Sequence, residues 1–175
     1  MYSAGPVSLA VETRRYFITQ TVIGAAIVNA LINAGFGWLG MLTIDRLPMW
    51  GSPSIVVDTI MTAFGVAFGT VLVVTFQARK DYFKGKADPQ LPTGWLGRLL
   101  AILPEGLFAR ALWLGLACVV LFVPGPIAWL IRAGVRDFGA SDFIGFKAAF
   151  SAVVGALVTP LISLYAMISA RGRPI

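Results

Sequence analysis

Histidine is absent from this chain of 175 residues, and cysteine occurs once, as Cys118. Without histidine, neither a serine–histidine catalytic pair nor a histidine-ligated zinc site can form. One thiol supports neither a disulfide framework nor dithiol exchange, so we interpret Cys118 as a small buried hydrophobe. GxxxxGK[ST] and GxSxG motifs are also absent. The sequence therefore predicts a protein that is not an enzyme and that has no cofactor or metal.

Charged residues are scarce as well. They make up 13% of the chain, whereas hydrophobic residues make up 58%. Soluble domains are typically about 25% charged, so this deficit predicts a membrane protein. The net charge is +6, which in a soluble protein would suggest nucleic acid as a partner. Here the basic residues flank apolar runs, and we expect them to contact the bilayer and its anionic headgroups, with no nucleic acid bound.

Long apolar runs are what the chain has in abundance. A helix needs roughly 20 apolar residues to cross a bilayer, and four segments qualify, at about 16–41, 55–78, 107–131 and 143–169. Thr93 is a plausible N-cap for a further apolar segment, 95–103, which is too short to span and ends at Pro104. The predicted fold is an all-α membrane protein of one domain, 1–175, with four transmembrane helices and one short interfacial helix.

The first and third spans resemble each other. Segment 17–39 aligns without gaps to 108–130 at an offset of 91, with six identical positions that include Gly24/Gly115 and Trp38/Trp129. The second and fourth spans align at an offset of 86. We therefore predict two helical-hairpin repeats, about 16–78 and 107–170, joined by a connection at 79–106. Because each unit holds two spans, the repeats would be parallel, with a pseudo-twofold axis along the membrane normal.

Lysine and arginine are distributed unequally between the two sides of such a bundle. Ten lie on the side of the termini and the long connection, and four lie on the opposite side. The positive-inside rule then predicts that both termini are cytoplasmic. On that side we expect seven residues to contact lipid headgroups, namely Arg79, Lys80, Lys84, Lys86, Trp95, Arg98 and Arg110.

Small and polar residues occur at helix-packing spacings within the spans. Asn29 and Asn33 lie four residues apart, and an amide in hydrocarbon needs a hydrogen-bond partner. We predict that they join helices, while a polar lining for a substrate or ion path is the alternative. Small residues four apart let helix backbones approach closely, and two such pairs are predicted to pack against neighbouring helices, Gly65 with Gly69 and Ser151 with Gly155.

Two charged residues and two prolines lie inside the predicted spans. Asp58 and Lys147 are each about one turn from the non-cytoplasmic face, and we predict that they form an ion pair. It would act as a clamp between helices or, alternatively, as a proton or cation site. Pro124 and Pro126 should interrupt the third span, and the aligned 33–35 segment should be a weak point of the first. Such matched breaks indicate either packing kinks and early helix ends or a binding site.

Three segments carry a resemblance to a known family. The run PMWGSPSIVVDT at 48–59, with FKAAF at 146–150 and VTPLI at 158–162, resembles small four-span bacterial inner-membrane proteins that are loosely labelled permease-like. The resemblance implies a location in the bacterial inner membrane and suggests no catalytic residue.

Three functions are compatible with these observations. Because the spans are apolar nearly all round, we expect a small, non-catalytic accessory subunit that stabilises other integral membrane proteins or its own copies. The alternative is a small oligomeric transporter or channel, lined by Asn29, Asn33, Asp58, Lys147 and the break at Pro124. The third is a lipid-binding membrane protein that uses the interfacial helix and its basic flank.

Overall fold

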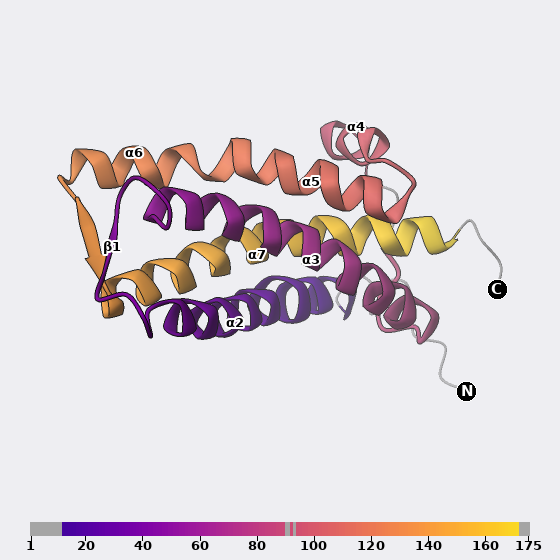
Figure 1. The fold of residues 1–175 in the computed structure, drawn as a ribbon. Helices are drawn as coiled ribbons and strands as arrows, with labels where there is room; N and C mark the ends of the chain where they lie inside the picture. The colour runs from indigo at the N-terminus through magenta and orange to yellow at the C-terminus, as the bar shows by residue number, and fades with distance from the viewer. Residues whose placement is uncertain (1–11, 90–91, 93, 172–175) are drawn as a thin grey trace.

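A computed structural model describes residues 12–89, 92 and 94–171. Four helices are long and apolar enough to cross a membrane, Glu12–Gly40, Ile55–Phe83, Leu107–Arg132 and Ala140–Arg171. The four predicted spans are therefore confirmed, although each helix extends beyond its predicted limits at one or both ends. They run alongside one another, and the start of the first helix lies at the same end of the bundle as the end of the fourth (Figure 1). We call this the terminal end.

The first membrane helix changes from π-helical to α-helical hydrogen bonding along its length. It contains a π-helical segment, η1 (Phe17–Gly24), followed by α2 (Ala25–Gly40). The weak point predicted at 33–35 is wrong, because this stretch is regular α-helix. Asn33 and Gly37 are buried there, and tertiary packing of this kind overrides weak helix propensity.

The third membrane helix has a local break rather than an early end. It consists of α5 (Leu107–Phe122) and α6 (Pro124–Arg132). Between them, Val123 keeps helical dihedral angles, φ −77° and ψ −43°. Pro124 occupies the first position of α6, where a missing N–H is tolerated. The two helices therefore continue in nearly the same direction (Figure 1), and we expect the break to act as a packing feature.

Two short strands close the other end of the bundle. The sequence analysis did not predict β1 (Arg46–Pro48) and β2 (Asp137–Gly139), which pair antiparallel with Leu47 opposite Phe138. An exposed ion pair joins Arg46 to Asp137 across them at 2.5 Å. We call this the strand end. The pairing joins the loop after the first helix to the loop before the last.

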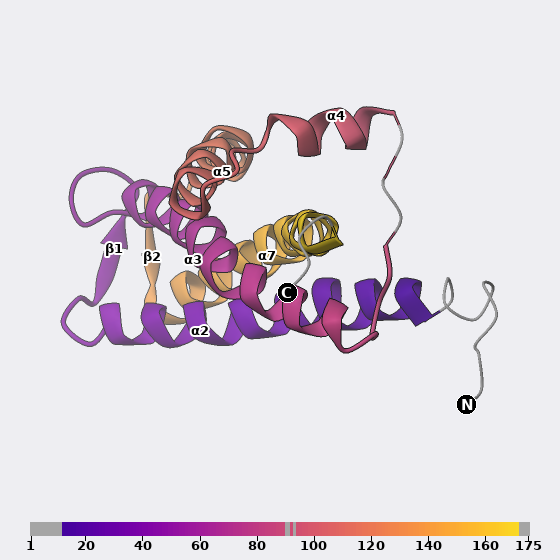
Figure 2. The same cartoon turned by 90° about the vertical axis from the view of Figure 1, so that its right-hand side faces the viewer.

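Helices α3 (Ile55–Phe83) and α7 (Ala140–Arg171) form the centre of the bundle. They pack on each other, α2 packs on α7, and α5 packs on α3. Neighbours in the chain, such as α2 and α3, are therefore not the main packing partners. The short helix α4 (Trp95–Ile102) lies at the terminal end, away from α2 (Figure 2). It begins after Gly94, and the predicted cap at Thr93 falls outside the described residues.

Candidate functional site: a lateral groove between α2 and α3

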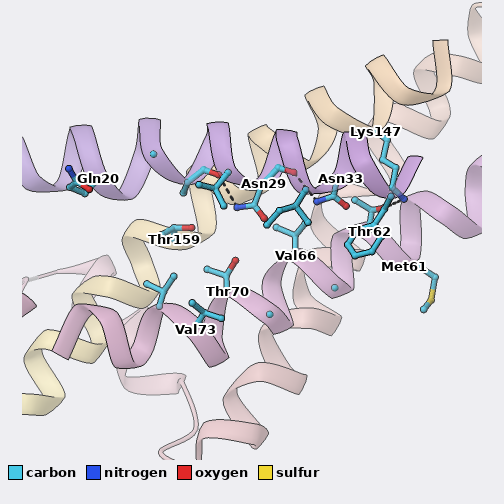
Figure 3. A pocket seen from close by; sticks show the side chains of 18 residues that line it. Gln20, Asn29, Asn33, Met61, Thr62, Val66, Thr70, Val73, Lys147 and Thr159 are labelled. Carbon is cyan, nitrogen blue, oxygen red and sulfur yellow. Dashed lines mark hydrogen bonds between the residues drawn. The ribbon is translucent and has the colours of Figure 1, made fainter. Parts of the chain in front are cut away.

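A groove of about 650 Å³ lies between α2 and α3. Because α2 and α3 pack mainly on other helices, they leave this space between them, with α7 behind it. Most of its lining is apolar or small. The polar side chains that reach it are Gln20, Asn29, Asn33, Thr62, Thr70, Lys147 and Thr159 (Figure 3).

The two asparagines satisfy their amide groups within their own helix. Asn29 Nδ2 donates to the carbonyl of Ala25 at 2.9 Å, and Asn33 Nδ2 donates to the carbonyl of Asn29 at 3.0 Å. These hydrogen bonds stay within one helix, while the predicted contact with a neighbouring helix is made by packing of the Asn29 side chain against Gly155. An apolar environment favours the nearest acceptor, which for a helical side chain is the carbonyl four residues earlier.

The contact between α2 and α7 at this point is made by Asn29 and by two small residues of α7. Ser151 Oγ donates to the Asn29 carbonyl at 3.1 Å. Gly155 lies so close to the Asn29 side chain that a Cβ added there would overlap the amide. The packing predicted for Ser151 and Gly155 is thus present, against α2.

Gly65 and Gly69 differ from that pair. A Cβ added at either position would meet nothing within 4 Å, and both residues line the groove. The prediction that they pack against a neighbouring helix is therefore wrong within a single chain. The physical reason is that α2 packs on α7 rather than on α3.

At its strand end the groove is lined by Lys147, one member of the ion pair that the sequence predicts. Lys147 Nζ lies 2.5 Å from Asp58 Oδ1 and also donates to Thr62 Oγ1 at 2.9 Å. The lysine side chain is 8% exposed and that of the aspartate 27%. Sequence reasoning missed Thr62, although its position four residues after Asp58 places both on one helix face.

A hydroxyl at the back of the groove has no partner. Thr159 Oγ1 is buried and makes no hydrogen bond within the described part of the chain. A buried polar group without a hydrogen bond is unfavourable, particularly in hydrocarbon. This side chain was quoted in the family resemblance but not predicted as a site.

A second polar cluster, also unpredicted, lies at the terminal end. The Tyr16 hydroxyl donates to Asp81 Oδ2 at 3.0 Å, and Lys86 pairs with Asp81 Oδ1 at 2.8 Å. The sequence feature that could have predicted this cluster is the single acid, Asp81, among the basic residues at 79–86.

The residues predicted to contact headgroups fall into two groups. Five are exposed at the terminal end, Lys80, Lys84, Lys86, Trp95 and Arg98. Arg79 is half-buried, and Arg110 is only 2% exposed. The Arg110 side chain is therefore packed inside the bundle rather than exposed, and its contact with headgroups stays a prediction. Its guanidinium instead stacks on the Tyr165 ring, 4.2 Å from the ring centroid.

Neither a metal-binding cluster nor a similar protein of known function indicates what the groove binds. Residues 12–89, 92 and 94–171 contain no cluster of histidine, cysteine, aspartate or glutamate that could hold a metal ion. No family model, curated protein or solved structure matches the chain. The fold defines the class, a helical protein with four candidate membrane spans, and the groove is the feature from which a function must be argued.

Proposed function

We propose that the chain is a small, non-catalytic integral membrane subunit, and that the groove between α2 and α3 receives a transmembrane helix from another chain. The observation that carries this proposal is the open space over Gly65 and Gly69. Small residues four apart allow two helix backbones to approach closely, and such pairs are enriched at helix interfaces in membranes. Here the spacing is present, and no helix among the described residues lies against it.

The dimensions of the groove fit a helix that crosses the bilayer. Its lining on the first membrane helix runs from Gln20 to Phe36. The 16 steps between these residues, at 1.5 Å each, span roughly 24 Å, most of the thickness of a bilayer core of about 30 Å. An incoming helix can therefore contact the groove along most of its membrane-embedded length. A polar side chain on that helix would also give Thr159 a hydrogen-bond partner.

The proposal is tested by filling the groove. Gly65→Leu with Gly69→Leu should abolish the complex seen in mild detergent by size exclusion with light scattering, while the monomer keeps its thermal stability. Gly35→Leu is the matched control, since Gly35 is also helical and also has open space around it. A wild-type chain that purifies as a lone monomer would contradict the proposal.

Photo-crosslinking locates the contact. A photoreactive residue in place of Val73, which is exposed and lines the groove, should crosslink to a protein in native membranes. The same residue in place of Val120 on α5, which is 71% exposed and lies outside the groove, should not crosslink to that protein. Equal crosslinking at both positions would remove the groove from the interface.

A second candidate function is a small oligomeric transporter or channel. It is favoured by the continuity of polar side chains in the groove, from Lys147 and Thr62 at the strand end to Asn33 and Asn29 (Figure 3). Asn33→Leu should then abolish solute flux into proteoliposomes. Unchanged flux would exclude this amide from any such path.

We further propose that the chain arose by duplication of a helical hairpin. Leu47 pairs with Phe138 at the centre of the β1–β2 ladder, and their separation of 91 equals the offset between the first and third spans. Residues related by the repeat would therefore face each other across a twofold axis. The packing of α2 on α7 and of α5 on α3 fits the same relation.

We also propose that the protein lies in the bacterial inner membrane with both termini in the cytoplasm. The charge distribution and the family resemblance support this location.

A further inference from the structure

Two arginines lie toward the terminal end, on the neighbouring helices α3 and α5. Arg79 is near the end of α3, and Arg110 is the fourth residue of α5. The Nε atoms of both are buried without a hydrogen-bond partner among the described residues. Helices α3 and α5 pack on each other, so the two side chains lie at the same end of neighbouring helices. An anion between these helices would supply hydrogen-bond acceptors for both guanidinium groups.

No acidic side chain of the protein fills this role. The chain has eight aspartate and glutamate residues, and all eight lie in the described part. Four of them pair with other basic residues, as Asp58 with Lys147, Asp81 with Lys86, Asp88 with Arg171 and Asp137 with Arg46. The other four, Glu12, Asp45, Glu105 and Asp142, make no ion pair with either arginine.

The contacts that Arg110 does make do not compensate for its burial. Its guanidinium stacks on the Tyr165 ring, and such stacking recovers only part of the hydration that a buried cation loses. Its position in the first turn of α5 adds a further penalty, because the positive end of the helix dipole repels a cation. Gly106 caps this helix without a side-chain hydrogen bond. The same helix start would attract an anion.

The depth of the two arginines matches that of lipid phosphates. Arg79 is 24 residues from the start of α3, roughly 36 Å at 1.5 Å per residue. Arg110 is 22 residues from the end of α6, roughly 33 Å by the same rise. Both distances slightly exceed a hydrocarbon core of about 30 Å, so the guanidiniums lie in the headgroup layer if the strand end is at the opposite edge of the core.

We propose that Arg79 and Arg110 together bind a phosphate group, with Tyr165 fixing the orientation of the Arg110 guanidinium. The planar fork of arginine donates two parallel hydrogen bonds to a phosphate, which suits this anion better than a lysine would. The phosphate belongs either to a phospholipid headgroup or to a soluble phosphate compound. This inference is independent of the groove and of its occupant.

The test uses the full-length chain, delipidated in a neutral detergent. The change in melting temperature is followed while adding phosphatidylglycerol, while adding diacylglycerol, which lacks the phosphate, and while adding glycerol phosphate. We expect saturable stabilisation by at least one phosphate compound and none by diacylglycerol. Stabilisation by phosphatidylglycerol alone assigns the site to lipid, and stabilisation by glycerol phosphate assigns it to a soluble ligand.

The variants separate this site from general basic charge. Arg79→Gln should weaken phosphate binding about 10- to 100-fold, the effect of losing hydrogen bonds to a charged group. The matched control is Lys84→Gln, which removes an exposed charge from the same end and should leave the affinity nearly unchanged. Equal losses in the two variants, or an unchanged affinity in Arg79→Gln, would overturn the proposal.

Arg110→Met provides a readout that does not depend on a loss of stability. Without phosphate, this variant should melt at or above the temperature of the wild-type chain, because an unpaired buried cation is replaced by an apolar side chain. It should no longer respond to the phosphate compounds. If Arg110→Met is destabilised without ligand yet still responds to phosphate, the arginine is structural and the proposal is wrong.

Discussion

At the scale of single residues, Lys147 and Arg110 are both buried basic side chains, but only Lys147 has a carboxylate partner. Lys147 binds Asp58 and Thr62, so its three donors meet at least two acceptors of the same chain. Arg110 has an aromatic ring and no acid. A buried charge with a partner is neutralised within the fold, whereas the desolvation cost of one without a partner is not compensated.

The ion pair therefore predicts an asymmetric response to mutation. Lys147→Met alone should lower the free energy of unfolding by about 3 kcal/mol, the lower end of the range for breaking a buried pair, because Asp58 is left partly buried and unpaired. Lys147→Met with Asp58→Asn should recover most of that loss. Equilibrium unfolding in mixed micelles measures both, and equal stability of the two variants would contradict the pairing as a source of stability.

At the scale of elements, the two pairs of small residues have the same spacing in the sequence but different surroundings in the structure. Ser151 and Gly155 pack under Asn29, whereas Gly65 and Gly69 face the groove. Spacing predicts that a helix can be approached closely, but it does not specify which helix approaches. That is decided by the packing of α2 on α7, which the apolar pattern of either helix alone does not encode.

Alanine substitutions at two glycines of α7 test this distinction. Replacing glycine with alanine inside a helix usually stabilises it by about 1 kcal/mol. Gly145→Ala should show this gain, since a Cβ there meets nothing within 4 Å. Gly155→Ala should instead destabilise the chain by about 1–3 kcal/mol, because the new methyl group would overpack against Asn29. Thermal unfolding in detergent compares the two, and a gain at both positions would mean that α2 can move away.

At the scale of the whole molecule, the sequence predicts the four spans and the short helix, but not how the loops meet. Apolar runs and charge distribution identify spans because hydrocarbon imposes them locally. The pairing of β1 with β2 and the cluster of Tyr16 with Asp81 depend on residues 91 and 65 positions apart. The ion pair of Asp58 with Lys147 could be predicted because each residue lies about one turn from the same end of its predicted span.

The orientation of the molecule can be tested by labelling. In a Cys118→Ala background, Thr43→Cys at the strand end and Lys84→Cys at the terminal end both present an exposed thiol. With cytoplasmic termini, a membrane-impermeant maleimide added to intact cells should label position 43 and not position 84. Labelling of position 84 alone would invert the proposed orientation, and equal labelling of both in cells shown to be sealed would contradict α3 as a membrane-crossing helix.

The packing of α2 on α7 has a consequence for biogenesis. Chains emerge from the ribosome amino-terminal end first, so the first span reaches the bilayer long before the helix that covers its buried face has been translated. In that interval Asn29 and Asn33 can already donate to carbonyls of their own helix, which limits their exposure to lipid. A nascent chain that stops before Ala140 leaves the face of Asn33 and Gly37 uncovered, a signal by which incomplete copies can be distinguished from finished ones.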